Sequence, residues 1–253
     1  MNVTVVVPVL YREPRLLDTL RGLAALRGQL GVEILVMIDV PDPAREAEVR
    51  AENDPITAEA AATPIYRVGD RGFGSALRAG FARATGEAVI PVMGDVSENL
   101  DDIPRLVAAL DEGWDVVGGS RYMRGGGIVG NTAKQRVSKA YSVLMRLAGG
   151  PPIHDVSNAF KAYRRSVVAS VPTVADSFDI SVELTVKAAL AGFRVGEVPT
   201  VWTNRAEGQS HFDVRRELRN YGRWLALVAR KRRVEPMVRP RRSAVREATD
   251  DVR

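Results

Sequence analysis

Three charged residues are expected at the ends of apolar strands, where their side chains could bind phosphate or a cation. Asp39 ends the run EILVMID, Asp95 follows AVIPVMG, and Arg121 follows DVVGGS. A carboxylate can bind a hard divalent cation, and such a cation neutralises diphosphate oxygens. The guanidinium group of Arg121 offers a planar fork of donors that suits phosphate. These residue types predict a site for phosphorylated ligands.

The segment around Asp95 has two interpretations. In VMGDVSENLDDIP, the carboxylate of Asp95 can bind a hard divalent cation such as Mg²⁺ or Mn²⁺. Alternatively, Asp95, Ser97 and Glu98 form a turn and cap the helix that begins near Asp101. The sequence leaves both interpretations open.

A basic segment follows Arg121 in the chain. Lys134 and Ser138 are four residues apart in AKQRVSK, so they share one face if the segment is helical. Lysine supplies a mobile positive charge and serine a neutral donor, and both suit phosphate. The alternative is a solvated basic face of a helix.

Several other chemistries have no support in the sequence. Cysteine is absent, which excludes disulfides and thiolate chemistry. Histidine occurs only at His154 and His211, and no GxSxG motif of a serine hydrolase is present. Gly72 and Gly74 are followed by Leu77 where a dinucleotide fingerprint requires its third glycine. A nicotinamide, flavin or hydrolase function is therefore not expected.

The elements that must position these residues alternate between strand and helix patterns. Apolar runs such as VTVVVPV, VEILVMID and AVIPVMGD alternate with helical stretches such as RLLDTLRGLAAL and GSALRAGFARAT. This order predicts an α/β fold with a mostly parallel central sheet and helices on both faces, and with ligands at the carboxyl ends of the strands. Beyond Arg121 we expect a Gly-rich loop at MRGGGIVGN, a helix at AKQRVSKAYSVLMRLAGG and a loop followed by a strand at HDVSNAFKAYRR.

Length and charge divide the chain into three parts. We expect a catalytic domain at 1–212, a basic amphipathic helix at 213–233 and a disordered basic tail at 234–253. Residues 213–253 hold 13 Lys and Arg against 6 Asp and Glu, whereas the preceding part is nearly neutral. A basic end can meet anionic lipid, nucleic acid or solvent. No RNP motif or zinc finger is present, so nucleic acid is not expected as a partner.

The helix at 213–233 carries apolar residues at helical spacing with arginines between them. Its apolar stripe can pack on the catalytic domain, or it can lie on a membrane with arginines against anionic headgroups. No stretch approaches the roughly 20 apolar residues of a bilayer span, and we interpret the apolar start as a strand rather than a signal peptide. The expected location is cytoplasmic, with peripheral attachment to the inner face of the membrane.

With these residues in view, residues 3–212 resemble the polyprenyl-phosphate mannose synthase branch of the family 2 glycosyltransferases. The resemblance rests on segments in a fixed order, which are VVVPVLYRE, EILVMID, GFGSALRAGFARATGE, GGSRYMRGGG, KQRVSK, DVSNAFKAYRR and GFRVGEVPTVWTNRAEGQS. It implies the Rossmann-like GT-A fold and inversion at the anomeric carbon.

The resemblance also implies roles for particular residues. The residues implied to bind the nucleotide sugar are Pro8, Leu10, Glu13, Asp39, Gly74 and Arg205. Those implied to take part in catalysis are Asp95, Arg121, Lys134, Ser138 and Asp155. Asp95, Ser97 and Glu98 are the implied ligands of Mg²⁺ or Mn²⁺.

The sequence departs from the family pattern at the metal site. The usual Asp-x-Asp is Met93-Gly94-Asp95, so the first carboxylate is missing and Glu98 or water would have to replace it. His211 stands where many relatives carry lysine or arginine.

The expected reaction moves mannose or glucose from a nucleotide diphosphate to a polyprenyl phosphate, with GDP-mannose as the first candidate donor and UDP-glucose as the second. A phosphate monoester has a second pKa of about 6, so it needs no general base to act as a nucleophile. The alternative within the same family is a soluble or polysaccharide acceptor.

Overall fold

The computed structural model describes residues 1–69, 71–130, 133–204 and 214–230, without the side chains of 133–134 and 214–218. The expected tail at 234–253 lies outside these residues. The strands are β1 (Val3–Leu10), β2 (Val32–Val40), β3 (Thr63–Val68), β4 (Ala88–Pro91), β5 (Val116–Ser120), β6 (Gly127–Val129), β7 (Lys161–Arg164), β8 (Val195–Pro199) and β9 (Val201–Thr203). The helices are α1 (Leu16–Ala25), α2 (Glu46–Glu59), α3 (Phe73–Phe81), α4 (Ile103–Asp111), α5 (Ala133–Leu147), α6 (Arg165–Ser170), α7 (Ile180–Leu190) and α8 (Val214–Ala229).

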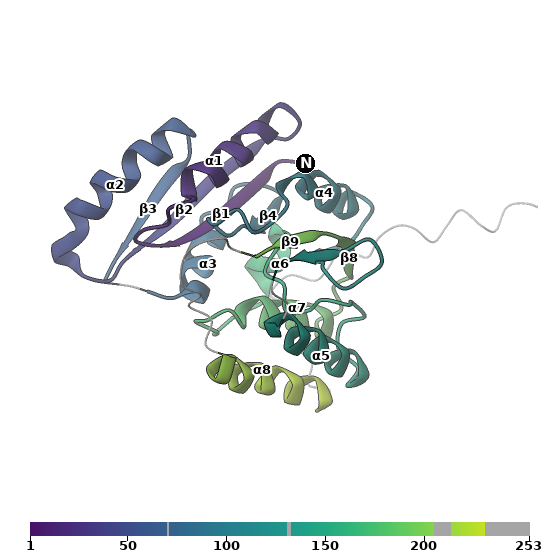
Figure 1. Cartoon of the computed structure of the whole chain (residues 1–253). Coiled ribbons are helices and arrows are strands. Elements are labelled where there is room, and N and C mark those ends of the chain that lie inside the picture. The colour runs from purple at the N-terminus through teal and green to yellow at the C-terminus, as the bar shows by residue number, and fades with distance from the viewer. Residues whose placement is uncertain (70, 131–132, 205–213, 231–253) are drawn as a thin grey trace, which may run out of the picture.

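A seven-stranded sheet in the order β3-β2-β1-β4-β7-β5-β8 forms the centre of the molecule (Figure 1). Strands β3, β2, β1 and β4 are parallel to one another, and β5 and β8 are parallel to each other. Strand β7 runs antiparallel to both of its neighbours, β4 and β5. The expectation of a mostly parallel α/β sheet is therefore confirmed.

Two apolar cores lie on opposite faces of the sheet. In β1, Val3, Val5 and Val7 face one core and Val6 faces the other, because successive side chains of a strand point to opposite faces. Helices α1, α2 and α4 supply the first core, and α3, α5, α6, α7 and α8 supply the second (Figure 1). A sheet covered on both faces explains why its strands read as continuous apolar runs.

The Gly-rich segment after Arg121 is more ordered than the sequence indicates. Residues 127–129 form β6, which pairs in parallel with β9 and makes a second, two-stranded sheet. The expectation of a loop is wrong here, since a strand of three residues with one glycine carries too little pattern to be recognised. An isolated bridge between Glu98 and Trp202 joins this small sheet to the segment that follows β4.

Helix α8 packs on the domain through the apolar residues that the structure describes. Tyr221, Trp224 and Val228 are buried in the second core. The hydroxyl of Tyr141 on α5 donates to the carbonyl of Tyr221 at 2.9 Å, and the two rings lie 4.9 Å apart. Of the two alternatives for this helix, packing on protein is the one found for these side chains.

Candidate active site

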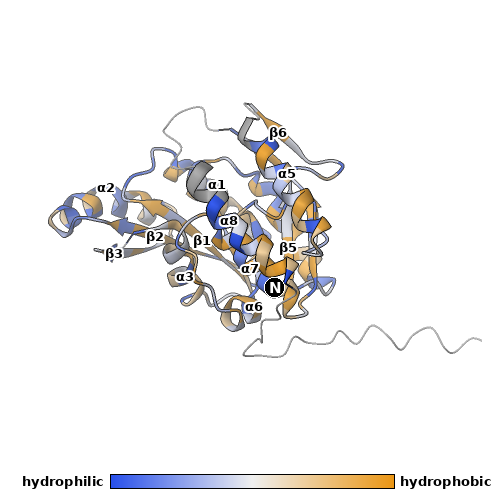
Figure 2. Ribbon diagram, turned by 90° about the horizontal axis from the view of Figure 1, so that it is seen from below, coloured by the Kyte–Doolittle hydropathy of each residue, from blue (hydrophilic) through white to orange (hydrophobic). Residues whose placement is uncertain are grey.

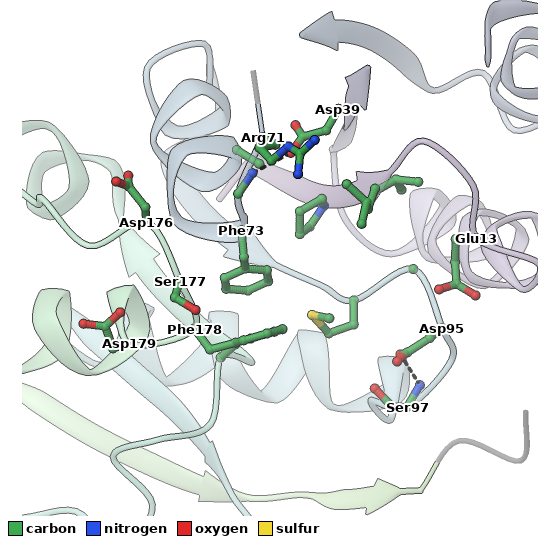
Figure 3. A pocket seen from close by; sticks show the side chains of 18 of the residues that line it. Glu13, Asp39, Arg71, Phe73, Asp95, Ser97, Asp176, Ser177, Phe178 and Asp179 are labelled. Atoms are coloured by element: carbon green, nitrogen blue, oxygen red, sulfur yellow. Dashed lines mark hydrogen bonds between the residues drawn. The ribbon is translucent and has the colours of Figure 1, made fainter. Parts of the chain in front are cut away.

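A cleft of about 1510 Å³ opens at the carboxyl ends of β1, β2 and β4. It lies where a parallel α/β sheet usually binds its ligands. Its walls include most of the residues singled out in the sequence, which are Pro8, Leu10, Glu13, Asp39, Asp95, Ser97, Glu98, Arg121 and Ser138. Figure 3 shows Asp39 and Arg71 at one end of the cleft and Glu13, Asp95 and Ser97 at the other.

Asp39 is held by the protein on both of its carboxylate oxygens. Arg67 on β3 donates to Oδ1 at 2.7 Å, and the backbone N–H of Gly72 donates to Oδ2 at 2.8 Å. Both charged side chains are almost fully buried, with 6% and 5% of their surfaces exposed. The pair therefore joins β2, β3 and the start of α3, and Asp39 presents to the cleft a carboxylate whose orientation is fixed. Arg67 was not anticipated from the sequence.

Gly74 lies behind the wall of the cleft. A Cβ atom at this position would stand 2.1 Å from the carbonyl oxygen of Ala175, so only glycine lets α3 approach that segment. Next to it, the rings of Phe73 and Phe178 stack with centroids 4.6 Å apart and face the cleft (Figure 3). Gly74 thus shapes the site through packing.

The acidic end of the cleft is a tight turn after β4. Oδ1 of Asp95 accepts from the backbone N–H of Ser97 at 3.1 Å, and Oε2 of Glu98 accepts from that of Met93 at 3.1 Å. Val96 between them has φ of +54°, a left-handed conformation that costs energy for a β-branched residue and is often found at functional sites.

Burial and the charge of Asp95 together raise the pKa of Glu98 to about 8. Asp95, Ser97 and Glu98 make the expected turn, but none of them caps the following helix: the N-cap residues are Asn99 for the short 3₁₀ turn Leu100–Asp102 and Asp102 for α4. The geometry brings together a buried pair of carboxylates that repel each other.

The basic end of the cleft is built on an ion pair between Arg121 and Asp155. Nε of Arg121 donates to Oδ2 at 2.6 Å and its terminal nitrogen donates to Oδ1 at 2.9 Å, so the pair is bidentate. The Asp155 side chain is fully buried and that of Arg121 is 10% exposed. Burial acts to raise the pKa of Asp155, but the Arg121 charge and the hydrogen bonds outweigh it and hold the pKa below 3.8. Asp155 stands behind Arg121 and fixes its direction.

Hydroxyl groups surround this guanidinium group. Oγ of Ser138 lies 2.6 Å from Oγ of Ser157 and 2.8 Å from the hydroxyl of Tyr122. Arg121 donates to both serines at 3.3 Å. Ser157 and Tyr122 were not anticipated as site residues, although each stands within two positions of a residue that was. The cluster can offer several donors to one anionic group.

Two residues implied by the resemblance remain predictions. Lys134 lies in the first turn of α5, one helical turn before Ser138, but its side chain is outside the described part of the structure. Arg205 lies outside the described residues altogether.

Comparison with known proteins identifies the family. The model of the family "Glycosyl transferase family 2" matches residues 4–171, so this chain belongs to the family 2 glycosyltransferases. The solved structure of glucosyl-3-phosphoglycerate synthase from Mycobacterium tuberculosis with Mn²⁺, UDP and phosphoglyceric acid superposes with a TM-score of 0.63 and 19% identity. That match covers 92% of this chain and 80% of the other, and it confirms the GT-A fold.

Two curated relatives act on lipid phosphates according to their names. The undecaprenyl-phosphate 4-deoxy-4-formamido-L-arabinose transferase of Klebsiella pneumoniae is 28% identical over 217 residues, which is 85% of this chain and 64% of the relative. The dolichol-phosphate mannosyltransferase of Pyrococcus furiosus is 30% identical over 215 residues, 83% of this chain and 59% of the relative. The chain therefore spans less than two thirds of the length of these relatives.

Proposed function

We propose that this protein transfers a hexose, mannose or glucose, from a nucleotide diphosphate sugar to a polyprenyl phosphate, with inversion at the anomeric carbon. The observation that carries the proposal is that one cleft has a buried acidic end at Asp95 and Glu98 and a basic end at Arg121. An acidic end suits a cation that carries a diphosphate, and a basic end suits a second phosphate. The names of both curated relatives support a lipid phosphate as the acceptor.

The acidic end fits Mg²⁺ or Mn²⁺. Burial and the neighbouring charge of Asp95 raise the pKa of Glu98, and a cation bound between the two side chains would offset both effects. Among the described residues no three His, Cys, Asp or Glu side chains form a cage, which suits a cation that takes few protein ligands and completes its shell with phosphate and water. Asp95, Ser97 and Glu98 would hold the cation, with Glu98 in place of the carboxylate missing at Met93. When bound, it would neutralise the leaving diphosphate.

The remaining work of the site is positioning. The acceptor phosphate is mostly dianionic at neutral pH and needs no base, since its second pKa is about 6. Arg121, Ser138 and Ser157 would hold it through charge-assisted and neutral hydrogen bonds, so that an oxygen faces the anomeric carbon. The bond from that oxygen to the sugar forms as the bond to the diphosphate breaks, which inverts the centre.

The membrane surface is proposed to meet α5. Four apolar side chains of this helix are exposed to solvent, among them Leu144 at 52% and Leu147 at 79%; the others are Val137 and Val143. Arg136 and Lys139 lie exposed on the same helix, and Figure 2 shows hydrophobic and hydrophilic residues side by side on α5. Such a surface suits an interface of acyl chains and anionic headgroups. None of the described helices has the length and apolar content that a bilayer span requires.

The sequence is compatible with a membrane contact for the helix at 213–233, which includes α8. We propose α5 as the helix that contacts the membrane instead. The protein is then peripheral, on the inner, cytoplasmic face. Flotation of the chain with anionic vesicles tests this assignment, with Leu144→Ser and Leu147→Ser together as the variant and Val174→Ser, an exposed apolar residue on another segment, as the control. Equal flotation of variant and control would remove α5 from the membrane contact.

Transfer is tested with a panel of GDP-, UDP- and dTDP-sugars, Mg²⁺ or Mn²⁺, and farnesyl phosphate as a short acceptor. We expect a lipid-linked product, with GDP-mannose as the first candidate donor and UDP-glucose, whose nucleotide occurs in the mycobacterial neighbour, as the second. Phosphoglyceric acid, named in that structure, serves as the soluble alternative acceptor. A product formed only from the soluble acceptor would replace the lipid phosphate in the proposal, and no product from any pair would refute it.

The metal is tested on binding as well as on turnover. Asp95→Asn is expected to abolish the rise in melting temperature that Mn²⁺ and a nucleotide sugar produce together, because a ligand that binds only the folded state stabilises it. Asp101→Asn, an exposed carboxylate nearby, is the matched control and should keep the rise. Retention of the rise in Asp95→Asn would exclude Asp95 as a ligand.

A further inference from the structure

Lys161 is a buried lysine that takes no direct part in the proposed reaction. It lies on β7 in the middle of the sheet and has no exposed surface. Among the described residues no ion pair involves it. A charged amine without a carboxylate partner is costly to bury, so its contacts call for an explanation.

The amine of Lys161 donates to two backbone carbonyls. Nζ lies 3.0 Å from the carbonyl oxygen of Val156, and it also donates to that of Asn158. A neutral amine has two N–H donors, and these two acceptors satisfy both. Burial lowers the pKa of Lys161 to about 7, while Asp155, Arg121 and Glu197 are the charged groups that face it. The geometry and the chemistry agree on a lysine that can stay uncharged.

The two carbonyls belong to residues on either side of Ser157. In the same short segment Asp155 binds Arg121 and Ser157 contacts Ser138. The side-chain nitrogen of Asn158 ties the segment to the carbonyl of Gly119 on β5 at 2.7 Å. Residues 155–158 thus supply part of the basic end of the cleft, and Lys161 is the group beneath them that fixes their backbone.

We propose that Lys161 is a positioning residue for the acceptor phosphate: its amine holds residues 155–158 so that Asp155 directs Arg121 and Ser157 directs Ser138. The inference rests on the proposed function, since it concerns the same phosphate site. It adds a residue that touches neither substrate and acts through the backbone.

Lys161→Met tests the inference, because methionine fills a similar volume and removes both donors. Binding of farnesyl phosphate, measured by calorimetry without donor, is expected to weaken about tenfold, the equivalent of one hydrogen bond. Binding of the nucleotide sugar should stay within about twofold. The melting temperature shows whether the variant is folded, because two hydrogen bonds are lost while a buried amine is removed. A wild-type affinity of the variant for farnesyl phosphate would overturn the inference.

Arg164→Met is the matched control. Arg164 lies on the same strand and also donates to two backbone carbonyls, those of Trp114 at 3.0 Å and Leu110, but at the end away from the cleft. We expect it to lose stability and to bind farnesyl phosphate as the wild type does. If both variants weakened binding equally, Lys161 would be structural and the inference would fail.

A double-mutant cycle with Ser157→Ala separates positioning from general damage. If Lys161 acts through Ser157, the losses in farnesyl phosphate affinity of the two single variants are not additive. Additive losses would contradict the inference. Should Lys161→Met not fold, Lys161→Leu, which also removes both donors, carries the same comparison. A wild-type protein that neither binds nor uses farnesyl phosphate would refute the proposed function itself.

Discussion

The variant Asp155→Asn leaves the guanidinium group of Arg121 largely buried without a carboxylate beside it. In the wild type the pair is bidentate, with donor–acceptor distances of 2.6 and 2.9 Å, and neither side chain is more than 10% exposed. Removal of one partner from such a buried pair costs about 3–5 kcal/mol, because the remaining charge has lost its compensation. We expect a loss of this size in the free energy of unfolding at pH 7.

The control is a pair with the same chemistry at the surface. Arg15 and Asp18 lie 2.7 Å apart, but each side chain is 49% exposed. Solvent screens this pair, so Asp18→Asn should cost at most about 1 kcal/mol. Urea unfolding of the three proteins, followed by circular dichroism, measures both differences in unfolding free energy.

The pH dependence gives a second measurement. The pKa of Asp155 is lowered in the folded state, so its stabilisation is fully present above the unfolded value of 3.8 and is lost as pH falls through the lower folded value. The difference between wild type and Asp155→Asn should therefore stay constant above about pH 5 and shrink only in acid. A loss for Asp155→Asn no larger than that for Asp18→Asn would refute the reasoning from burial.

Three further predictions use unfolding measurements and calorimetry. Between pH 7 and 10.5 the folded protein holds fewer protons at Lys161 than the unfolded chain. The free energy of unfolding of the wild type should therefore rise with pH relative to that of Lys161→Met, by up to roughly 5 kcal/mol. A difference between the two proteins that does not change with pH would contradict this. Trp224→Ala should lower the free energy of unfolding by about 3–5 kcal/mol, whereas Arg230→Ala, at an exposed position, should leave it almost unchanged. Equal losses in the two variants would mean that α8 is not packed on the domain. Arg67→Met removes the buried ion pair with Asp39, so it should weaken nucleotide-sugar binding and lower the free energy of unfolding by about 3 kcal/mol. Unchanged binding and stability would show that the pair contributes to neither.

The ends of the strands could be predicted because their signal is local. Short apolar runs placed Asp39, Asp95 and Arg121 at the carboxyl edge of the sheet, and the cleft lies there. The turn at Asp95 could also be expected from the sequence. That its residues do not cap the following helix could not be expected, since capping depends on where that helix begins. Strand β6 was missed because it is stabilised by β9, more than 70 residues further along the chain.

The partners of the charged residues could not be predicted. Arg67 is separated from Asp39 by 28 residues, and Asp155 from Arg121 by 34. Many arginines could meet either aspartate, and no spacing rule operates over such distances. The resemblance indicated that Asp155 belongs to the cleft, but its position behind Arg121, out of reach of a ligand, is a matter of packing.

The class of fold, the edge of the sheet where the cleft lies and the chemical types of the residues found there follow from the amino-acid sequence, because apolar periodicity and side-chain chemistry are properties of the chain. Which charges are paired, which are buried and which are directed into the cleft depends on the tertiary structure. Lys161 illustrates the difference: in the sequence it is one basic residue in KAYRR, and the fold makes it a buried amine between two carbonyls. Burial and pairing depend on segments brought together from far apart, and these set the electrostatics of the site.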